Sequence, residues 1–193
     1  MTKKKVGVYI GRFQPFHNGH KAVLEQATKD NDLVVLLIGR SAGPPTFKNP
    51  WSYLDRMDMI YNIGLKLAVD NDSCVCIFPL DDVPGDDAAW VAQVKARVQE
   101  MVATLKETEV PEISLYGCDK DASTYYLSLF PEWKQALFKL HSIHSINATD
   151  IRKKYFSDAK WRPYQPDIPS DTYAFMAGWR HSQTYKDIAA QQA

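Results

Sequence analysis

The feature that most constrains this chain is a change from strand to helix near its N-terminus. Residues 5–10 form a short apolar run that ends at Gly11 and Arg12, and a tight loop follows. His17 and His20 then open a segment with helical periodicity. In α/β folds, nucleotides bind where a strand ends and a helix begins. This arrangement indicates an α/β fold and phosphate chemistry on a nucleotide.

Apolar, strand-like runs alternate with helical patterns along the rest of the chain. The further runs cover residues 33–39, 74–79, 113–117 and, more weakly, 136–140. Apolar residues at helical spacing occupy residues 19–29, 52–68, 88–105 and 172–180. Short and almost uniformly apolar strands are typical of a parallel sheet covered on both faces. The succession predicts a doubly wound α/β domain with right-handed crossovers.

The length and composition favour one globular unit. A chain of 193 residues with a hydrophobic fraction of 45% can bury a sizeable core. We expect a single domain over residues 1–193, with a core over about 5–157 and a small helical C-terminal tail over about 158–193.

The charge balance excludes some partners. Lysine plus arginine equals aspartate plus glutamate at 23 each, so no basic excess points to nucleic acid. The longest apolar run, residues 33–38, is too short to span a membrane, and no signal-peptide pattern is present. We therefore expect a soluble, cytoplasmic protein that binds neither nucleic acid nor membranes.

The cysteines predict neither a disulfide nor a zinc site. Cys74 and Cys76 lie two apart in a strand-like run, so they face the same side, and Cys118 is isolated. Neighbouring positions on one face of a strand rarely form a disulfide, and no second pair completes a zinc site. We expect reduced core cysteines.

His17 and His20 are candidates for holding phosphate oxygens. Imidazoles beside a helix N-terminus can donate hydrogen bonds to oxygens that gain charge during displacement, and the helix dipole adds to the field. Gly19 lets a phosphate approach the backbone closely. The alternative is two surface histidines, one of them capping a helix. The preceding strand and the Gly11-Arg12 pair favour the phosphate-binding interpretation.

A second segment, residues 145–152, has the composition of a capped helix start. Asn147 or Thr149 can cap the helix, and the Thr149 hydroxyl and Arg152 suit the β- and γ-phosphates of a nucleotide. The alternative is an ordinary capped helix with a solvated arginine. From this segment alone, the alternative is favoured.

Together, the two segments resemble the signatures of the nucleotidyltransferase superfamily, H-x-G-H and I-S-x-T-x-x-R. The resemblance is closer to the archaeal-type nicotinamide-nucleotide adenylyltransferases, above all to the adenylyltransferase half of bifunctional enzymes that also carry a Nudix hydrolase. It rests on residues 11–20, 48–51, 119–127 and 146–152. Asn147 stands where the superfamily signature has serine. Because the chain ends at Ala193, no Nudix activity is expected.

The resemblance implies a Rossmann-like nucleotidyltransferase fold and an enzyme that joins ATP and nicotinamide mononucleotide to give NAD and pyrophosphate by direct in-line attack. It implies catalytic roles for His17, His20 and Arg152. It implies ATP or phosphate contacts for Gly11, Arg12, Phe13, Gly19, Lys48 and Thr149, and a nicotinamide-nucleotide contact for Trp90. Asp81 and Asp82 end the preceding strand-like run and are placed to hold a ribose or to orient the amide, with Asp81 as the candidate; the alternative is two solvated loop carboxylates. Mg²⁺ is expected to bind mainly through the ATP phosphates, with no metal ligands from the protein. Relatives often assemble, so a homo-oligomer is a further expectation.

Several residues near these motifs have plainer interpretations. Trp90 alone is as well explained by packing, and Tyr125 and Tyr126 are expected to pack rather than to bind ligand. Lys120 and Arg56 are weaker candidates, and Arg56 is expected on a helix in a salt bridge with a neighbouring aspartate.

Two other functions stay open at this point. One is a transferase of the same superfamily that acts on a pantetheine, sugar or polyol phosphate. The other is a non-catalytic sensor that binds NAD or ATP.

Overall fold

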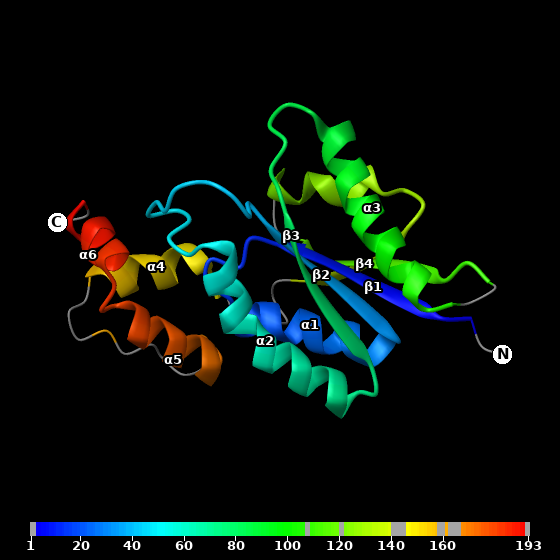
Figure 1. Cartoon of the computed structure of the whole chain (residues 1–193), viewed down its shortest axis with the longest axis horizontal. Helices are drawn as coiled ribbons and strands as arrows, with labels where there is room; N and C mark the ends of the chain where they lie inside the picture. The colour runs from blue at the N-terminus through cyan, green and yellow to red at the C-terminus, as the bar shows by residue number, and fades with distance from the viewer. Residues whose placement is uncertain are drawn as a thin grey trace.

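Strands and helices alternate over most of the chain. Figure 1 shows the computed structural model, which describes residues 3–106, 109–119, 122–139, 146–157, 161 and 167–191. The elements are β1 (Lys5–Gly11), α1 (Asn18–Asp30), β2 (Leu33–Gly39), α2 (Tyr53–Asp70), β3 (Cys74–Leu80), α3 (Asp87–Thr104), β4 (Glu112–Asp119), the 3₁₀ helix η1 (Ala122–Leu129), β5 (Lys134–Lys139), α4 (Ala148–Ser157), α5 (Ser170–Trp179) and α6 (Gln183–Ala190).

The described strands form one parallel sheet in the order β3-β2-β1-β4-β5. The chain moves outward from the central β1 to β3 and then crosses back to β4. The winding therefore reverses between β1 and β4, and ligands of such sheets bind outside the carboxyl ends of the strands at this point. The predicted doubly wound α/β fold is confirmed.

Apolar layers cover both faces of the sheet. On one face, Val8 of β1 and Val35 of β2 pack with Val94 of α3. On the other, Leu36 of β2 packs in a cluster with Met59 of α2 and side chains of α1. In Figure 1, α3 lies on one side of the sheet and α1 and α2 on the other. Burial on both sides explains why the strands are apolar without alternation.

The C-terminal helices share a core with α1 and α2. Tyr155 of α4, Met176 of α5 and Ile188 of α6 belong to the same buried cluster as Leu24 of α1. Tyr155 also donates a hydrogen bond to the Met176 carbonyl at 2.8 Å. The predicted tail is therefore packed against the α/β core, close to the loops at one end of the sheet.

Side chains cap the helices that begin at this end of the sheet. His17 caps α1, and Ser52 caps α2 in a capping box with Asp55. The Asp86 carboxylate accepts the backbone N–H of Ala89 at 2.8 Å at the start of α3. Each cap satisfies an N–H that would otherwise lack a partner, which is worth about 1 kcal/mol.

Parts of the fold differ from the sequence-based expectations. The η1 and α6 helices were not predicted, because residues 122–129 lack a 3.6-residue apolar period and α6 buries a single residue, Ile188. The cysteine thiols are free, but Cys74 is exposed rather than part of the core. Cys74 is the first residue of β3, an edge strand that has a neighbour, β2, on one side alone.

Among the described helices, none is both long enough and apolar enough to cross a lipid bilayer.

Candidate active site

A cavity of about 730 Å³ opens at the carboxyl ends of β1 and β4, where the winding reverses. Four of the predicted site residues line it, namely Gly11, Arg12, His20 and Trp90. The other lining residues include Tyr9, Gly39, Asp82, Val83, Asp87, Gly117, Cys118, Tyr125 and Tyr126. The cavity thus joins the β1–α1 loop to the start of α3, as expected for a nucleotide site at a topological switch point.

His17 and His20 form a reciprocal pair at the start of α1. The His17 Nδ1 accepts the backbone N–H of His20, and the His20 Nδ1 accepts the backbone N–H of His17, both at 3.3 Å. Because each Nδ1 is occupied as an acceptor, the neutral imidazoles carry their protons on Nε2. The capping box therefore fixes a tautomer with an Nε2–H donor on both rings.

Gly11 and Phe13 support this pair. A Cβ on Gly11 would lie 2.6 Å from the Phe13 ring, so glycine is needed for Phe13 to fold back over the strand end. Phe13 has a φ of 50° in the left-handed region, and its buried ring makes an edge contact with His20 at 5.0 Å. A ligand could reach Phe13 only through its backbone, since the side chain is a wall of the histidine pair.

Aromatic side chains from α3 and η1 also line the cavity. Trp90, half-buried near the start of α3, meets the ring of Tyr126 edge-on with centroids 5.9 Å apart. Burial raises the pKa of Tyr126 to about 12, and its hydroxyl donates to the Ile10 carbonyl at 3.4 Å. The exposed Tyr125 donates to the Asp87 carboxylate at 3.0 Å. Tyr126 packs as predicted. Tyr125 and Tyr126 also line the cavity, which the sequence analysis did not predict. Their place in the motif at 119–127 was the signal for this role.

Charged groups cross the mouth of the cavity. Arg12 lies 3.8 Å from the Asp82 carboxylate, so the loops after β1 and β3 meet there. Asp82, rather than the predicted Asp81, lines the cavity. The Asp81 carboxylate instead accepts a hydrogen bond from Ser41. The sequence gives no reason to prefer one of two adjacent aspartates. The conformation of the loop decides which carboxylate faces the cavity.

The second predicted motif reaches the same loop from the other side. Asn147 caps α4, since its Oδ1 accepts the backbone N–H of Thr149 at 2.7 Å. Arg152 donates to the Thr149 hydroxyl at 3.2 Å and to the Gln14 carbonyl at 2.5 Å. The structure thus brings Thr149 and Arg152 together beside the β1–α1 loop, although neither lines the cavity.

The remaining phosphate-binding candidates have different surroundings. Lys48 is exposed, in a turn closed by hydrogen bonds between Thr46 and Asn49, and it does not line the cavity. Gly19 is buried in the first turn of α1. Lys120 lies outside the described residues.

Arg56 lies on a helix, α2, as predicted, but the predicted salt bridge with a neighbouring aspartate is wrong. It is fully buried, and its guanidinium donates to the carbonyls of Ser52, Arg12, Gly39 and Arg40 at 2.6–3.0 Å. Burial lowers its pKa to about 10. Asp55, a predicted partner, instead caps α2. Arg56 therefore ties the loops after β1 and β2 to the first turn of α2.

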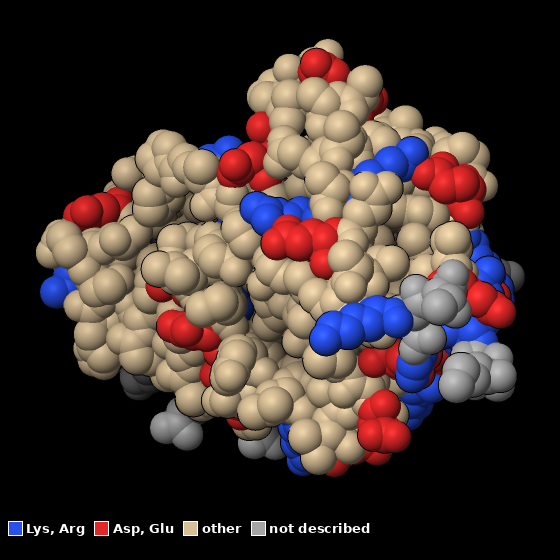
Figure 2. Space-filling view, turned by 45° about the vertical axis from the view of Figure 1, so that its right-hand side comes forward, with Lys and Arg blue, Asp and Glu red and all other residues tan. Residues whose placement is uncertain are grey.

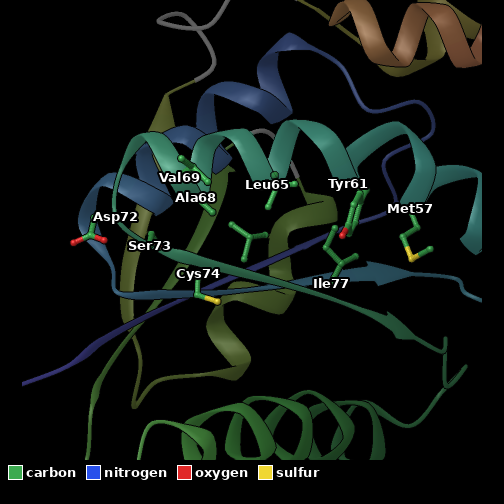
Figure 3. A pocket seen from close by; sticks show the side chains of 11 residues that line it. Met57, Tyr61, Leu65, Ala68, Val69, Asp72, Ser73, Cys74 and Ile77 are labelled. Carbon is green, nitrogen blue, oxygen red and sulfur yellow. The ribbon is translucent and has the colours of Figure 1, made fainter.

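A second cavity, of about 570 Å³, lies between α2 and the edge strand β3. Figure 3 shows apolar side chains of Met57, Leu65, Val69 and Ile77 around it. Asp72 at one end is its charged lining residue. A cavity with so few polar groups lacks the means to orient a phosphate ester, so the cavity at the strand ends is the candidate site.

The described residues contain no group of three His, Cys, Asp or Glu side chains placed to hold a metal ion. On the face in Figure 2, Lys and Arg side chains alternate with Asp and Glu, with no continuous basic patch.

Residues 8–154 match the family model for cytidylyltransferase-like proteins. The match covers the sheet, the cavity and both predicted motifs. The chain belongs to the cytidylyltransferase-like family, whose nucleotide site this fold and cavity define.

Within that family, the similar proteins are adenylyltransferases of nicotinamide nucleotides. The chain is 30% identical over 182 residues to the nicotinamide/nicotinic acid mononucleotide adenylyltransferase of Acinetobacter baylyi, covering 94% of this chain and 89% of that protein. It is 32% identical over 162 residues to the nicotinamide-nucleotide adenylyltransferase of Methanocorpusculum labreanum, covering 83% and 84% of the two chains. The resemblance to nicotinamide-nucleotide adenylyltransferases, archaeal ones included, is confirmed.

A solved structure agrees with the sequence relatives. The chain superposes on a bifunctional NMN adenylyltransferase/ADP ribose pyrophosphatase from Francisella tularensis with a TM-score of 0.81 and 29% identity. The match covers 98% of this chain and 53% of the other, so this chain spans about half the length of that protein. Another structure of the same protein contains AMP and a manganese ion.

Proposed function

We propose that the protein is a nicotinamide-nucleotide adenylyltransferase, which joins ATP and nicotinamide mononucleotide to give NAD and pyrophosphate. The observation that carries this proposal is the pairing of His17 and His20 beside a cavity that His20 and Trp90 both line. The histidine pair and the indole suit the two parts of the reaction, a phosphate to be transferred and an aromatic base to be held. The named relatives catalyse this reaction class.

The reaction needs positioning and charge stabilisation more than a protein nucleophile. The 5′-phosphate of the mononucleotide is already anionic at neutral pH and attacks the α-phosphorus of ATP, and pyrophosphate leaves. Nε2–H donors on His17 and His20 stabilise the charge that develops on the α-phosphate and the leaving oxygens. Arg152, Thr149, Lys48 and Arg12 hold the triphosphate and the incoming phosphate, with backbone contacts from Gly11, Phe13 and Gly19.

The nicotinamide ring stacks on Trp90. A pyridinium ring is a planar cation, and the face of an indole attracts it. Tyr126 holds the indole from its edge. Asp82 at the cavity mouth can accept hydrogen bonds from a ribose, a role that the sequence assigned to Asp81.

Mg²⁺ binds with ATP in this proposal. An ion of this kind is held mainly by phosphate oxygens and water, so it needs few ligands from the protein. When bound, the ion neutralises part of the triphosphate charge. The manganese ion in the Francisella tularensis structure supports a divalent metal for this class of site.

A pyrophosphate-release assay tests the proposal. The protein is mixed with ATP and Mg²⁺ and with one acceptor at a time: nicotinamide mononucleotide, nicotinic acid mononucleotide or phosphopantetheine. We expect release with a nicotinamide-type acceptor, together with NAD or its acid analogue. Release with phosphopantetheine alone would favour a different transferase, and ATP binding without release from any acceptor would favour a sensor.

Three further expectations stay predictions. They are a single functional domain, a cytoplasmic location and assembly into a homo-oligomer. The apolar side chains of Leu54, Tyr61, Leu65 and Val69 on α2 are exposed, so light scattering on the purified protein, with and without charged substitutions there, tests the assembly.

A further inference from the structure

Gln14 bonds to both of the other segments that carry phosphate-binding candidates. Its side-chain amide pairs with the backbone of Trp51: Nε2 donates to the Trp51 carbonyl at 2.8 Å, and Oε1 accepts the Trp51 N–H at 3.2 Å. Its own carbonyl accepts the Arg152 guanidinium at 2.5 Å. Gln14 thus connects the β1–α1 loop, the loop before α2 and the start of α4.

The Gln14–Trp51 pair is shielded from water. Gln14 is 4% exposed and Trp51 is 2% exposed. The Trp51 indole packs against Tyr155 of α4 and Trp179 of α5, with ring centroids 5.6 and 5.7 Å apart. Buried hydrogen bonds are costly to break because the separated groups find no water partners. The pair is therefore a rigid joint between the two loops.

Each connected segment carries a phosphate-binding candidate. Lys48 lies three residues before Trp51, in the turn that hydrogen bonds close between Thr46 and Asn49. Arg152 is aimed by the Gln14 carbonyl on one side and by Thr149 on the other. His17 follows Gln14 by three residues, at the end of the same loop. A displacement at Gln14 would move these cations relative to the histidine pair.

We propose that Gln14 is a positioning residue for adenylyl transfer: its amide holds the loop of Lys48, and its carbonyl holds Arg152, at a fixed distance from His17 and His20. Gln14 is not a catalytic residue, because its polar atoms bond to protein groups and it does not line the cavity. This inference rests on the proposed function and deepens it.

The substitution Gln14→Glu separates the hydrogen bonds from the shape of the side chain. The two side chains have nearly the same size, but an ionised carboxylate has no donor for the Trp51 carbonyl. A protonated carboxyl restores both bonds, since its hydroxyl can donate and its carbonyl can accept. Desolvation favours the protonated form. Arg152 and Arg56, which donate to the Gln14 and Arg12 carbonyls of this loop, favour the ionised form. Activity lost through ionisation should therefore return as the pH falls.

The experiment measures kcat and KM for ATP between pH 5.5 and 9 in the wild type, in Gln14→Glu and in Gln14→Met. Gln135→Glu is the control, because the Gln135 amide also donates to backbone carbonyls, those of Leu127, Phe130 and Trp133, and none of these residues lines the cavity. Circular dichroism and the thermal midpoint record how much of each variant is folded.

We expect kcat/KM for ATP to fall roughly tenfold to a hundredfold in both Gln14 variants at pH 8, as for a misplacement of binding groups by a fraction of an ångström. The kcat/KM of Gln14→Glu, divided by that of the wild type at the same pH, should rise as the pH falls to 5.5. The ratio for Gln14→Met should stay flat, and Gln135→Glu should match the wild type.

The proposal is overturned if the Gln14→Glu ratio does not change with pH, or if the loss of activity equals the loss of folded protein. An inactive wild type would instead refute the proposed function, so the two failures are distinguishable.

Discussion

The imidazole rings of His17 and His20 stack nearly parallel, with centroids 3.6 Å apart and an angle of 18° between their planes. Each ring accepts the backbone N–H of the other residue. The cap of α1 and the proposed phosphate donors are therefore the same two side chains. This double use makes the start of α1 rigid where the reaction needs fixed donors.

Capping and chemistry can be separated at His17. Asparagine is a good helix cap but has no Nε2–H donor. The free energy of unfolding of His17→Asn should therefore be about 1 kcal/mol higher than that of His17→Ala. Both variants should lose most of their turnover. Urea unfolding and the pyrophosphate assay measure the two effects. A His17→Asn enzyme with wild-type turnover would show that His17 acts only as a cap.

His20→Ala should lower turnover by ~10²–10³-fold with a modest change in KM, as for the loss of a donor used mainly in the transition state. Steady-state kinetics with ATP and nicotinamide mononucleotide check this. His181→Ala, an exposed histidine after α5, is the control and should change neither constant. Near-normal turnover in His20→Ala would refute the catalytic role.

Trp90→Ala should raise the KM for nicotinamide mononucleotide roughly tenfold and the KM for ATP much less. The tenfold change corresponds to the loss of the interaction between a stacked cation and the indole face. The KM of Trp90→Phe for nicotinamide mononucleotide should lie between those of the wild type and Trp90→Ala. Initial rates with each substrate varied in turn measure the difference. An equal rise in both KM values would assign Trp90 to the packing of the cavity wall with Tyr126 and Phe130.

Arg56→Met should lower the free energy of unfolding by about 3–5 kcal/mol, because four backbone carbonyls lose the buried guanidinium that donates to them. Arg56→Lys should recover only part of this loss, since one ammonium lacks the planar fork of donors. Urea titrations measure both. Arg97→Met, which removes an exposed i,i+3 pair with Glu100, is the control and should cost under about 1 kcal/mol. A similar cost for both substitutions would contradict the role given to Arg56.

Asp32 makes the stability of the N-terminal strand depend on pH. Burial acts to raise the pKa of Asp32, but hydrogen bonds from the Lys4 ammonium at 2.9 Å and the Lys5 N–H at 2.8 Å lower it overall. A carboxyl with a lowered pKa in the folded state stabilises above its unfolded pKa, and the stabilisation disappears as the pH falls through the folded value. The melting temperature of Asp32→Asn should therefore be lower than that of the wild type at pH 7 and equal to it at pH 3.

The matched substitution for this test is Asp58→Asn, on an exposed position of α2. Its melting temperature should stay at a constant difference from that of the wild type over the same pH range. A gap for Asp32→Asn that persists at pH 3 would show that the hydrogen bonds, and not the charge, stabilise this corner.

The local pattern of the chain determined its elements and its histidine motif. Apolar runs and helical spacing located the strands and the main helices to within a few residues, because burial of a strand or a helix face requires that spacing. The change from β1 to α1 and the residues at 146–152 indicated the nucleotide site, because a helix start and its cap are encoded by consecutive residues.

The tertiary structure alone decided which polar side chains became internal. Arg56 and Gln14 look like surface residues, yet both are buried because distant loops bring backbone groups to them. Asp82 rather than its neighbour Asp81 lines the cavity for a similar reason: the path of a loop, not the identity of the residue, sets the direction of each side chain. Such partners are far apart in the chain, so no local pattern records them.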